Sequence, residues 1–450
     1  MKRLAGVLLL ENQGEILVIQ RAQHLRFQPG YWSFPGGGVE TSDGNGSKRE
    51  RAAKAALREC EEEVGIALDN TAFTSLRLLG RWQTPTYAEP GFDTFFFLLQ
   101  IDGDRPRVDA NPEVATWQWL SPTAFRQQWQ KAHKIASRPV LEALEAVEQP
   151  GPPRNHNSME VRDFLCMGGQ ALYLPLATAT LPPATHTNCV LLPTPSGFYL
   201  VDPAPIDPKE RKLLFQCVQD KVQRYGPPLG LILSHLHYDH LGAAQWLAER
   251  LKIPILASRA TDEDLRSGAG SGLSAGGASG GGVVTIERYL QEGDRFGVWR
   301  VLETPGHARG HLCFYSEVEQ TLICGDMCAG RGTILIEPNQ GNMSHYLHSL
   351  QRLADLKPQL AIPAHGQPLA NAAVVLGDLR DHRLRREKKI LRSLRNHPSK
   401  TAYQLTPMGY DDANPSVWPL AALSVESHLI KLAEDGLARR LGDVWLAVDD

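Results

Sequence analysis

The chain has 450 residues, of which 42% are hydrophobic and 22% charged, and its net charge at pH 7 is -3. This length predicts roughly two to four domains, each long enough to bury a hydrophobic core. The balanced charge excludes steering of the whole chain toward nucleic acid or an anionic membrane, although local clusters of charge can still act.

The cysteine spacing and the lengths of the apolar runs indicate where in the cell the protein is expected. The seven Cys include no Cys-x-x-Cys pair, which is typical of reduced thiols rather than of a disulfide framework. The apolar run at residues 4–10 is short and lacks a small-residue cleavage site, so it predicts a first β-strand and not a signal peptide. No apolar run approaches the roughly 20 residues of a membrane span. We therefore expect a cytoplasmic protein without a membrane partner.

Residues 1–148 alternate strand-like runs with one strongly helical segment. The first strand is expected to turn through Gly14 into a second one at residues 16–19, and later strands are expected at 95–101 and 116–120. Residues 149–158 are a cluster of Pro, Gly and Asn, which is the composition of a linker.

Residues 159–375 contain recurring apolar, strand-like runs with helical segments between them. The expected strands are 188–192, 197–201, 230–233, 300–303, 322–324 and 360–363. Residues 267–282 are dominated by Gly, Ser and Ala and predict a flexible surface insertion.

The pattern of residues 376–450 is mainly helical. A basic helix is expected at 379–396, a second helix at 425–434, which Gly436 ends, and a last strand around Trp445. The whole chain is thus expected to be an α/β and α+β multidomain protein.

Three carboxylates share one face of the helix in the first region. Glu59, Glu62 and Glu63 stand at positions i, i+3 and i+4, and apolar residues occupy the opposite face. Clustered carboxylates are hard oxygen ligands suited to Mg²⁺ or Mn²⁺. Such ions neutralise a diphosphate and activate the attacking water.

Residues 44–66, from Gly44 and Glu50 to Arg58 and the three glutamates, resemble the Nudix box. This resemblance implies a Nudix hydrolase domain of α/β/α fold at residues 1–148, with Glu59, Glu62 and Glu63 as catalytic metal ligands. In that family the first glycine of the box is usually the second of a Pro-Gly-Gly, but Gly37 lies too far from Arg58. Either the loop is expanded, or the match at Gly44 and Glu50 is fortuitous.

Residues 17–37, which contain Arg21, Arg26 and the Pro-Gly-Gly run, resemble the signature of coenzyme A diphosphatases within the Nudix family. This resemblance implies a small-molecule diphosphate substrate such as coenzyme A or a derivative. The implied substrate-binding residues are Arg21, Arg26, Gly36 and Gly37. The two arginines could instead be generic phosphate-binding or surface residues.

Four histidine- or aspartate-containing motifs follow strand-like runs in the second region, which places them together at one edge of a sheet. Their metal-binding side chains are His235, His237, Asp239, His240, His307, Asp326 and His365. Imidazole and carboxylate groups suit Zn²⁺, Mn²⁺ or Fe. Metal binding lowers the pKa of water to about 7, so a hydroxide shared by two ions would be the nucleophile.

The order of these motifs resembles the metallo-β-lactamase fold, an αββα sandwich expected over residues 159–375. The resemblance implies three sets of ligands: His235, His237 and His307 for one ion, Asp239, His240 and His365 for the other, and Asp326 as the bridge. Asp239 and Asp326 are also expected to be catalytic. The implied cofactors are two Zn²⁺, or Mn²⁺ or Fe, in addition to the Mg²⁺ or Mn²⁺ of the first region.

Residues 341–350 and 381–391 resemble the β-lactamase-like endoribonuclease subfamily, whose C-terminal winged helix is then expected at residues 376–450. Asp202 matches the first acidic residue of the superfamily, which usually supports the metal loop. His311 could orient a ligand, bind substrate or be a plain polar residue of the lining.

Between Arg380 and Lys400 there are nine Lys or Arg and two acidic residues. This basic tail could bind RNA through its phosphates, or it could be a solvated helix packed on the hydrolase domain. The residues expected to hold a polyanion are Arg383, Arg385, Arg386, Lys388, Lys389 and Arg392.

The expected function is that of a bifunctional metal-dependent hydrolase. The Nudix domain would cleave a nucleoside-diphosphate-type substrate, and the second domain an RNA-like phosphodiester. Alternatively, the second domain could be a thioesterase acting on acyl-coenzyme A or glutathione-type thioesters. In a further alternative, one domain could be a non-catalytic binding module.

Overall fold

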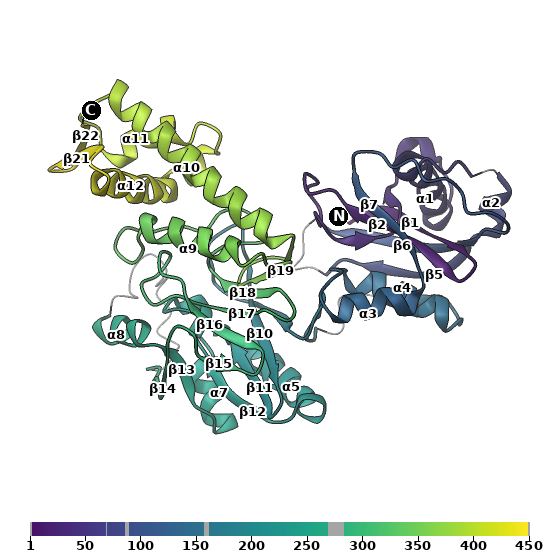
Figure 1. The fold of residues 1–450 in the computed structure, drawn as a ribbon, viewed down its shortest axis with the longest axis horizontal. Coiled ribbons are helices and arrows are strands. Elements are labelled where there is room, and N and C mark those ends of the chain that lie inside the picture. Colours follow the sequence, from purple (N-terminus) through teal and green to yellow (C-terminus); the bar gives the residue numbers. More distant parts are fainter. Residues whose placement is uncertain (1, 69, 86–89, 157–161, 269–282, 449–450) are drawn as a thin grey trace. The chain divides into compact units, whose positions relative to one another are not determined.

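The computed structural model describes residues 2–448 except 69, 86–89, 157–161 and 269–282. The end of the expected linker, the start of the region predicted from residue 159 and nearly all of the predicted insertion at 267–282 therefore lie outside the described residues. The chain divides into two compact units, residues 1–174 and 175–450. Each unit is described by itself (Figure 1).

The first unit is built on an eight-stranded mixed sheet. Its strands are β1 (Arg3–Asn12), β2 (Glu15–Arg21), β3 (Trp32–Ser33), β4 (Gly36–Gly38), β5 (Arg77–Gln83), β6 (Phe92–Gln100), β7 (Val114–Leu120) and β8 (Arg154–His156). The main path runs β3-β2-β1-β6-β5-β8, while β4 pairs with β1 and β7 with β2. The expected turn at Gly14 is present, with a φ of 81° that suits glycine.

Helices cover both faces of this sheet, so the first unit is a three-layer sandwich (Figure 1). Its helical segments are η1 (Thr41–Asp43), α1 (Lys48–Val64), α2 (Asn70–Ser75), α3 (Pro122–Gln130) and α4 (Arg138–Glu148). Because side chains alternate along a strand, Leu8 and Leu10 of β1 pack toward α1, whereas Val7 and Leu9 pack toward α3 and α4.

The second unit contains two six-stranded sheets. The first consists of β9 (Leu172–Ala177), β10 (His186–Thr194), β11 (Gly197–Val201), β12 (Pro228–Ile232), β13 (Ile255–Ser258) and β14 (Arg288–Leu290). The second consists of β15 (Arg295–Phe296), β16 (Trp299–Glu303), β17 (Leu312–Ser316), β18 (Thr321–Gly325), β19 (Leu360–Pro363) and β20 (Leu369–Ala370). Each strand expected between residues 188 and 363 coincides with, or overlaps, one of these.

Helices pack on both sheets of the second unit. They are α5 (Pro208–Tyr225), α6 (Tyr238–Leu241), α7 (Ala244–Leu251), α8 (Arg259–Ser267) and α9 (Met343–Asp355). Helices α5, α7 and α8 contact strands β11 to β13, while α9 and the next helix share the hydrophobic core of the second sheet. This arrangement is the expected αββα architecture.

The chain continues into a C-terminal segment of helices and a two-stranded sheet. Its elements are α10 (Ala372–Asn396), α11 (Ala402–Gly409), η2 (Pro415–Val417), α12 (Trp418–Glu434), β21 (Ala438–Leu441) and β22 (Val444–Ala447). Helix α10 begins seven residues earlier than expected, because Ala372 and Leu376 are buried in the core of the second sheet. The proposed boundary between residues 375 and 376 therefore falls inside one continuous helix.

Among the residues that the structure describes, no helix combines the length and apolar character that crossing a membrane requires.

Candidate metal centres

Helix α1 presents the three predicted glutamates in its last two turns and ends at Gly65, whose left-handed conformation is typical of a helix C-terminus. Glu59, Glu62 and Glu63 are called the carboxylate site below. Glu63 is buried, and its Oε2 accepts a hydrogen bond of 2.9 Å from the backbone N–H of Gly36. Glu62 is exposed, with 53% of its side-chain surface accessible.

The two glycines after Pro35 allow strand β4 to approach helix α1 closely. A Cβ atom on Gly37 would lie 2.2 Å from Oε1 of Glu59, and one on Gly36 would lie 2.5 Å from the backbone oxygen of Gly6. The predicted substrate-binding glycines thus lie beside the carboxylates. A side chain at either position would displace the backbone or the carboxylate that it meets.

Arg58 links the carboxylates to the loop before α1. Its guanidinium lies 2.8 Å from Glu62, 3.1 Å from Glu59 and 3.3 Å from the buried carboxylate of Asp43. These contacts hold two glutamates at defined positions while leaving other lone pairs on each carboxylate available. Sequence reasoning used Arg58 only as part of the motif and missed this anchoring role.

Burial changes the acidity of the carboxylate site. Desolvation raises the pKa of Glu63 to about 7, and it also raises the pKa of Glu59. A buried group that is costly to ionise becomes an anion when a cation binds it, because the cation stabilises the charged form. The donor set and its environment therefore fit a divalent ion with oxygen ligands.

Glu50 lies at the other end of α1, where it caps the helix. Its carboxylate accepts a 2.7 Å hydrogen bond from the backbone N–H of Ser47, and this bond lowers its pKa. Gly44 ends η1 with a φ of 81°. Neither residue is among the groups that contact the three glutamates in the described structure, which favours the interpretation that their match to the Nudix box is fortuitous.

The two predicted substrate-binding arginines differ in their placement. Arg21 is close enough to Glu63 to lower its pKa electrostatically, and its Nε donates to the backbone oxygen of Phe27 at 3.2 Å. Arg26 is exposed, and the described residues show no contact between it and the carboxylates. The structure therefore brings one of the two arginines to the carboxylate site.

The seven predicted ligands of the second region lie together shortly after four strands of the second unit, five of them in loops and two, Asp239 and His240, in helix α6. They follow β12, β16, β18 and β19, as the sequence analysis expects, and all are buried. They are called the histidine-rich site below and consist of His235, His237, Asp239, His240, His307, Asp326 and His365. Three groups among them have ligand atoms close enough to hold a metal ion.

The first group contains three facing ring nitrogens. Nδ1 of His237 lies 2.9 Å from Nε2 of His235 and 2.9 Å from Nε2 of His307. The other nitrogen of His307 bonds the backbone oxygen of Leu335 at 2.8 Å, and that of His237 bonds Oε1 of Gln340 at 2.5 Å. Because an oxygen of this kind only accepts, Nδ1 of His307 and Nε2 of His237 carry the ring protons. In the neutral rings the other nitrogen of each histidine then presents its lone pair to the other rings of the group.

The same arrangement recurs in the second group, which contains Asp239, His240 and His365. Nδ1 of His240 bonds the carboxylate of Asp202 at 2.9 Å, and Nδ1 of His365 bonds the backbone oxygen of His186 at 3.0 Å. Nε2 of His365 then faces Asp239 at 3.5 Å. Outer acceptors that fix the tautomer are typical of metal-ligating histidines.

Asp326 lies between the two groups. Its Oδ2 is 3.4 Å from Nε2 of His307, and its Oδ1 is 3.7 Å from Nε2 of His240 and 3.5 Å from Nε2 of His365. Both Oδ1 of Asp326 and Nε2 of His240 are buried without a hydrogen-bond partner. Unpaired buried polar atoms that converge with inward lone pairs fit two cations sharing this carboxylate.

Burial and mutual repulsion set the acidity of these groups. Desolvation lowers the pKa of His307 to about 4 and holds that of His235 well below its usual value. Burial opposes ionisation of Asp326, but His365 and His240 outweigh it and hold the pKa of Asp326 well below the usual range. The shifts at His235 and His307 favour neutral imidazoles, the form that binds a metal ion. Burial opposes protonation of His240, but Asp326, Asp202 and Asp239 outweigh it and raise the pKa of His240 well above its usual value, so a cation bound there would replace a proton.

Two further residues support the ligands. Asp202 accepts hydrogen bonds from the backbone N–H and the hydroxyl of Ser234, at 2.8 and 2.7 Å, besides its bond with His240. Nε2 of His311 accepts a 3.0 Å bond from the backbone N–H of Asp326. Of the three possible roles of His311, this contact with the backbone of Asp326 favours the orienting one. The hydrogen bonds of Asp202 join it to the loop that carries the first predicted ligands.

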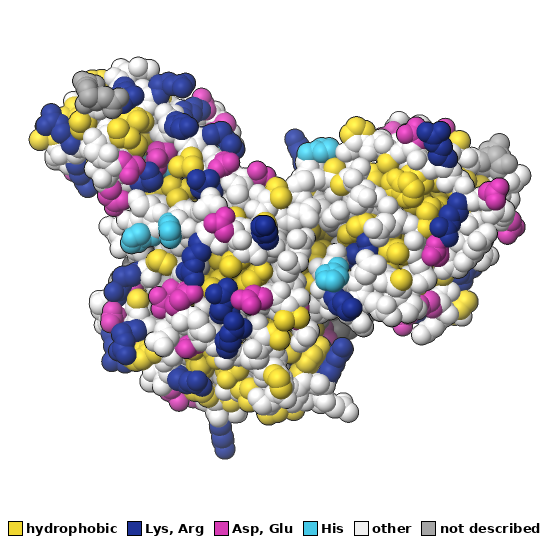
Figure 2. All heavy atoms as spheres, viewed as in Figure 1, with side chains coloured by type: hydrophobic (Ala, Val, Ile, Leu, Met, Phe, Trp, Pro, Cys, Tyr) yellow, Lys and Arg dark blue, Asp and Glu magenta, His cyan; other side chains and the backbone are white. Residues whose placement is uncertain are grey.

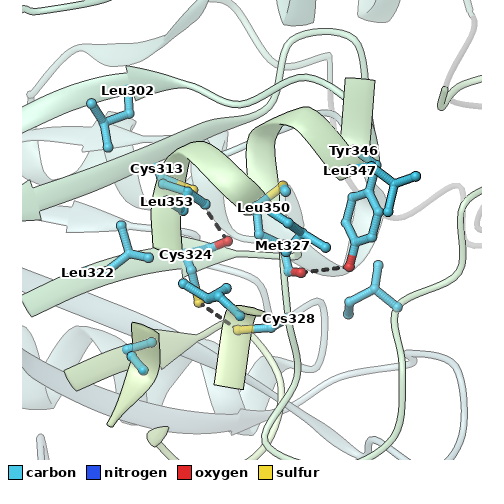
Figure 3. Close-up of a cluster of buried hydrophobic side chains, with 14 of the residues drawn as sticks. Leu302, Cys313, Leu322, Cys324, Met327, Cys328, Tyr346, Leu347, Leu350 and Leu353 are labelled. Carbon is cyan, nitrogen blue, oxygen red and sulfur yellow. Dashed lines mark hydrogen bonds between the residues drawn. The ribbon is translucent and has the colours of Figure 1, made fainter. Parts of the chain in front are cut away.

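A hydrophobic cluster fixes the loop that carries Asp326 (Figure 3). Tyr346 of α9 donates a 2.7 Å hydrogen bond to the backbone oxygen of Met327, and the sulfurs of Cys324 and Cys328 lie 3.3 Å apart. These groups are fully buried. Asp326 therefore lies in a segment that buried contacts hold on both sides of it.

The basic tail is only partly available to a ligand. Arg383 and Arg386 are buried; Arg383 donates to the backbone oxygen of Ile334, and Arg386 pairs with Asp412 at 2.6 Å. Lys389 pairs with Asp411. The cations that remain exposed from the predicted set are Arg385, Lys388 and Arg392. Figure 2 shows Lys and Arg side chains alongside Asp and Glu over the C-terminal segment.

Three segments of this chain match known protein families. Residues 2–144 match the NUDIX domain, residues 182–365 the metallo-beta-lactamase superfamily, and residues 401–445 the beta-lactamase associated winged helix domain. A "Beta-lactamase-like protein 2 homolog" from Caenorhabditis elegans is 25% identical over 46% of this chain and 65% of its own length. Its namesake from Drosophila melanogaster is 26% identical over 51% of this chain and 80% of its own length.

A third relative, the "Atrochrysone carboxyl ACP thioesterase" of Aspergillus chevalieri, is 37% identical over 23% of this chain and 32% of its own length. Among solved structures, a beta-lactamase domain protein from Burkholderia ambifaria has a TM-score of 0.55 at 21% identity, covering 65% of this chain and 97% of its own. That likeness shows the fold alone. The chain therefore contains a NUDIX domain, a metallo-beta-lactamase superfamily domain and the winged helix domain associated with that superfamily.

Proposed function

We propose that the chain is a bifunctional metal-dependent hydrolase. The carboxylate site cleaves a nucleoside-diphosphate-type substrate, such as coenzyme A or a derivative, with Mg²⁺ or Mn²⁺. The histidine-rich site hydrolyses an RNA-like phosphodiester with two Zn²⁺, Mn²⁺ or Fe ions. The observation that carries the second assignment is the set of inward-facing ring nitrogens, whose outer partners leave them free to bind cations.

In this proposal the residues of the histidine-rich site divide into two groups of three and one residue between them. His235, His237 and His307 would hold one cation, and Asp239, His240 and His365 the other. Two cations bound there would lower the pKa of water to about 7 and polarise the bond to be cleaved. Asp326 would keep the two groups together, since its two oxygens face different histidines. His311 would orient Asp326 through its backbone N–H.

The exposed part of the basic tail supports a polyanionic substrate. Arg385, Lys388 and Arg392 are spaced at i, i+3 and i+7, so they share one face of α10, and all three are exposed. A phosphodiester chain bound along this face would displace counterions, and each contact would steepen the salt dependence of binding by roughly 0.7 in the logarithmic slope for a single strand.

Replacing these three cations by Gln tests the RNA proposal. We expect RNA binding to weaken at low salt and the salt slope to flatten by about two units, since three contacts are lost. A small activated ester should be hydrolysed as before, because the metal centre is unchanged. The matched control replaces Lys209, Lys212 and Arg224 of α5, three exposed cations of the same unit. An equal effect of both triple variants would contradict the proposal.

A thioester is the second candidate substrate of the histidine-rich site. The relative named a carboxyl ACP thioesterase favours it, and so does the internal pairing of Arg383, Arg386 and Lys389, which halves the predicted basic set. A thioester would depend more on apolar contacts and less on salt. If acyl-coenzyme A is hydrolysed while RNA is neither bound nor cleaved at low salt, this candidate replaces the phosphodiester.

The third possibility, that one domain only binds its ligand, is tested by the same substrates. Each domain is assayed with its metal ions on coenzyme A esters, nucleoside diphosphates and RNA. A domain that binds metal and substrate without turnover would be a binding module. The complete donor sets of both sites argue for two catalysts.

A further inference from the structure

The C-terminal segment contacts the loop that supports two of the predicted metal ligands. This loop, residues 334–342, is called the bracing loop. Its Leu335 oxygen accepts the hydrogen bond from His307, and its Gln340 side chain accepts the one from His237. The orientation of both rings therefore depends on where the backbone of the bracing loop lies.

Two buried residues of the C-terminal helices hold the start of this loop. Ser427 of α12 donates a 2.6 Å hydrogen bond to the backbone oxygen of Ile336, next to Leu335. Arg383 of α10 donates to the backbone oxygen of Ile334, on the other side of Leu335, and its guanidinium lies 5.6 Å from the ring centre of Tyr346. Ser427 and Arg383 are only 3% and 2% exposed.

A third contact holds the end of the loop. Glu434, near the end of α12, accepts hydrogen bonds from the side chains of Asn342 and Ser344, at 3.1 and 2.5 Å. The backbone N–H of Asn342 in turn donates to Gly306, directly before His307. The C-terminal helices thus fix the bracing loop on both sides of the residues that contact the two histidines.

We propose that the winged-helix segment, together with helix α10, is a positioning element of the metal centre. Ser427, Arg383 and Glu434 hold the bracing loop so that Leu335 and Gln340 fix the rings of His307 and His237. This inference rests on the proposed metal-binding role of those histidines. It gives the C-terminal segment a task that does not depend on whether the substrate is RNA or a thioester.

Binding of Co²⁺ to the full-length, metal-free chain tests this role. Loss of the outer partners of metal-ligating histidines weakens metal binding by roughly 10- to 100-fold, so Ser427→Ala, which acts one step further out, should weaken it by about tenfold. Visible absorption of the bound ion separates a nitrogen-rich site from the oxygen ligands of α1, because the two geometries differ. The spectrum of the variant should also change, since the rings of His307 and His237 lose their fixed orientation.

Ser393→Ala is the matched control. The Ser393 hydroxyl bonds the backbone oxygen four residues earlier in α10, as the Ser427 hydroxyl also does in α12, but it makes no contact with the bracing loop in the described structure. Its Co²⁺ affinity and spectrum should equal those of the wild type. If Ser427→Ala fails to fold, Glu434→Ala, at an exposed position, is the variant that tests the proposal. Its Co²⁺ affinity should be about threefold weaker than that of the wild type, a smaller effect than the loss of a direct partner of a ligand would have.

The outcomes separate this inference from the proposed function. If the wild-type chain binds no Co²⁺ in a nitrogen-rich site, the proposed metal centre itself is wrong. If the wild type binds Co²⁺, and folded Ser427→Ala or Glu434→Ala has the wild-type affinity and spectrum, the positioning role is wrong. A lower melting temperature with unchanged metal binding would also overturn it, because that result would show a contribution to stability alone.

Discussion

The two metal centres of this chain are assembled in opposite ways. The carboxylate site comes from one helix, with Glu59, Glu62 and Glu63 on one face within five residues, and the side chain of Glu62 is 53% exposed. The seven side chains of the histidine-rich site come from four separate segments between residues 235 and 365, and each of them is buried. Helical spacing brings the three glutamates of the first site together, whereas the second site exists only when the two sheets are complete.

This difference changes what a substitution should do. A ligand on an exposed helix face can be replaced by water, so its loss leaves the neighbours in place. A buried ligand shared by two groups cannot be replaced in this way, because its removal leaves other buried polar atoms without a partner. We therefore expect graded effects in the carboxylate site and nearly complete loss of activity in the histidine-rich site.

Asp326→Asn should have the largest effect. The charge that faces both histidine groups is lost, and we expect hydrolysis at this site to fall by at least roughly 10³-fold, the upper end for one charged contact in a transition state. Diphosphate cleavage at the carboxylate site should stay at the wild-type rate. Parallel assays of both reactions on the full chain check this prediction. Loss of both activities in a folded protein would show that the two sites are coupled.

Glu62→Gln should have the next largest effect. The substitution preserves size but removes one charged ligand from α1, and we expect diphosphate cleavage to fall by roughly 10²-fold. The measurement is the steady-state rate with Mg²⁺ or Mn²⁺, with hydrolysis at the histidine-rich site as the internal control. A wild-type diphosphatase rate would mean that this helix is not the metal site.

The affinity of the carboxylate site for Mg²⁺ should depend on pH. Because Glu63 has a pKa of about 7 in the metal-free protein, Mg²⁺ must displace a proton from it at lower pH. Affinity should rise by up to roughly tenfold per pH unit between about pH 5 and 7 and level off above pH 7. Titration calorimetry at several pH values tests this. Equal affinity at pH 5.5 and 7.5 would contradict the assigned environment of Glu63.

Glu50→Gln should have the smallest effect. Because this carboxylate caps the first turn of α1, far along the helix from the other glutamates, diphosphate cleavage should stay within about twofold of the wild-type rate, as is usual for surface substitutions. The comparison with Glu62→Gln under the same conditions is the measurement. If Glu50→Gln lowers the rate of diphosphate cleavage as much as Glu62→Gln does, Glu50 is a metal ligand of the site.

The sequence predicted those parts of both sites that depend on local patterns. The face shared by Glu59, Glu62 and Glu63 follows from helical spacing, and the αββα strands follow from apolar runs that end at the histidine motifs. The placement of Glu50 could not be predicted in this way, because a Ser three residues before a Glu fits both a helix cap and a ligand motif.

Sequence patterns could not predict hydrogen-bond and ion-pair partners that lie far apart in the chain. Gln340 lies 103 residues from His237, and no motif marks an amide that meets an imidazole over that separation. The basic density of the tail predicted exposure, but Arg386 and Lys389 pair with Asp412 and Asp411, which lie more than 20 residues further along. The early start of α10 was missed because its first turns are apolar and resemble the preceding core.

The wide separation of the histidine-rich ligands has a consequence for the order of synthesis. His235 and His237 leave the ribosome on the order of ten seconds before His365, at the usual rate of translation. During this interval the nascent chain carries three histidines and one aspartate of the site without the other three side chains, and such open sites bind Cu²⁺ more tightly than Zn²⁺. Selection of the correct cation therefore falls to the finished, buried site and to the supply of metal in the cell, whereas all three glutamates of α1 emerge almost together.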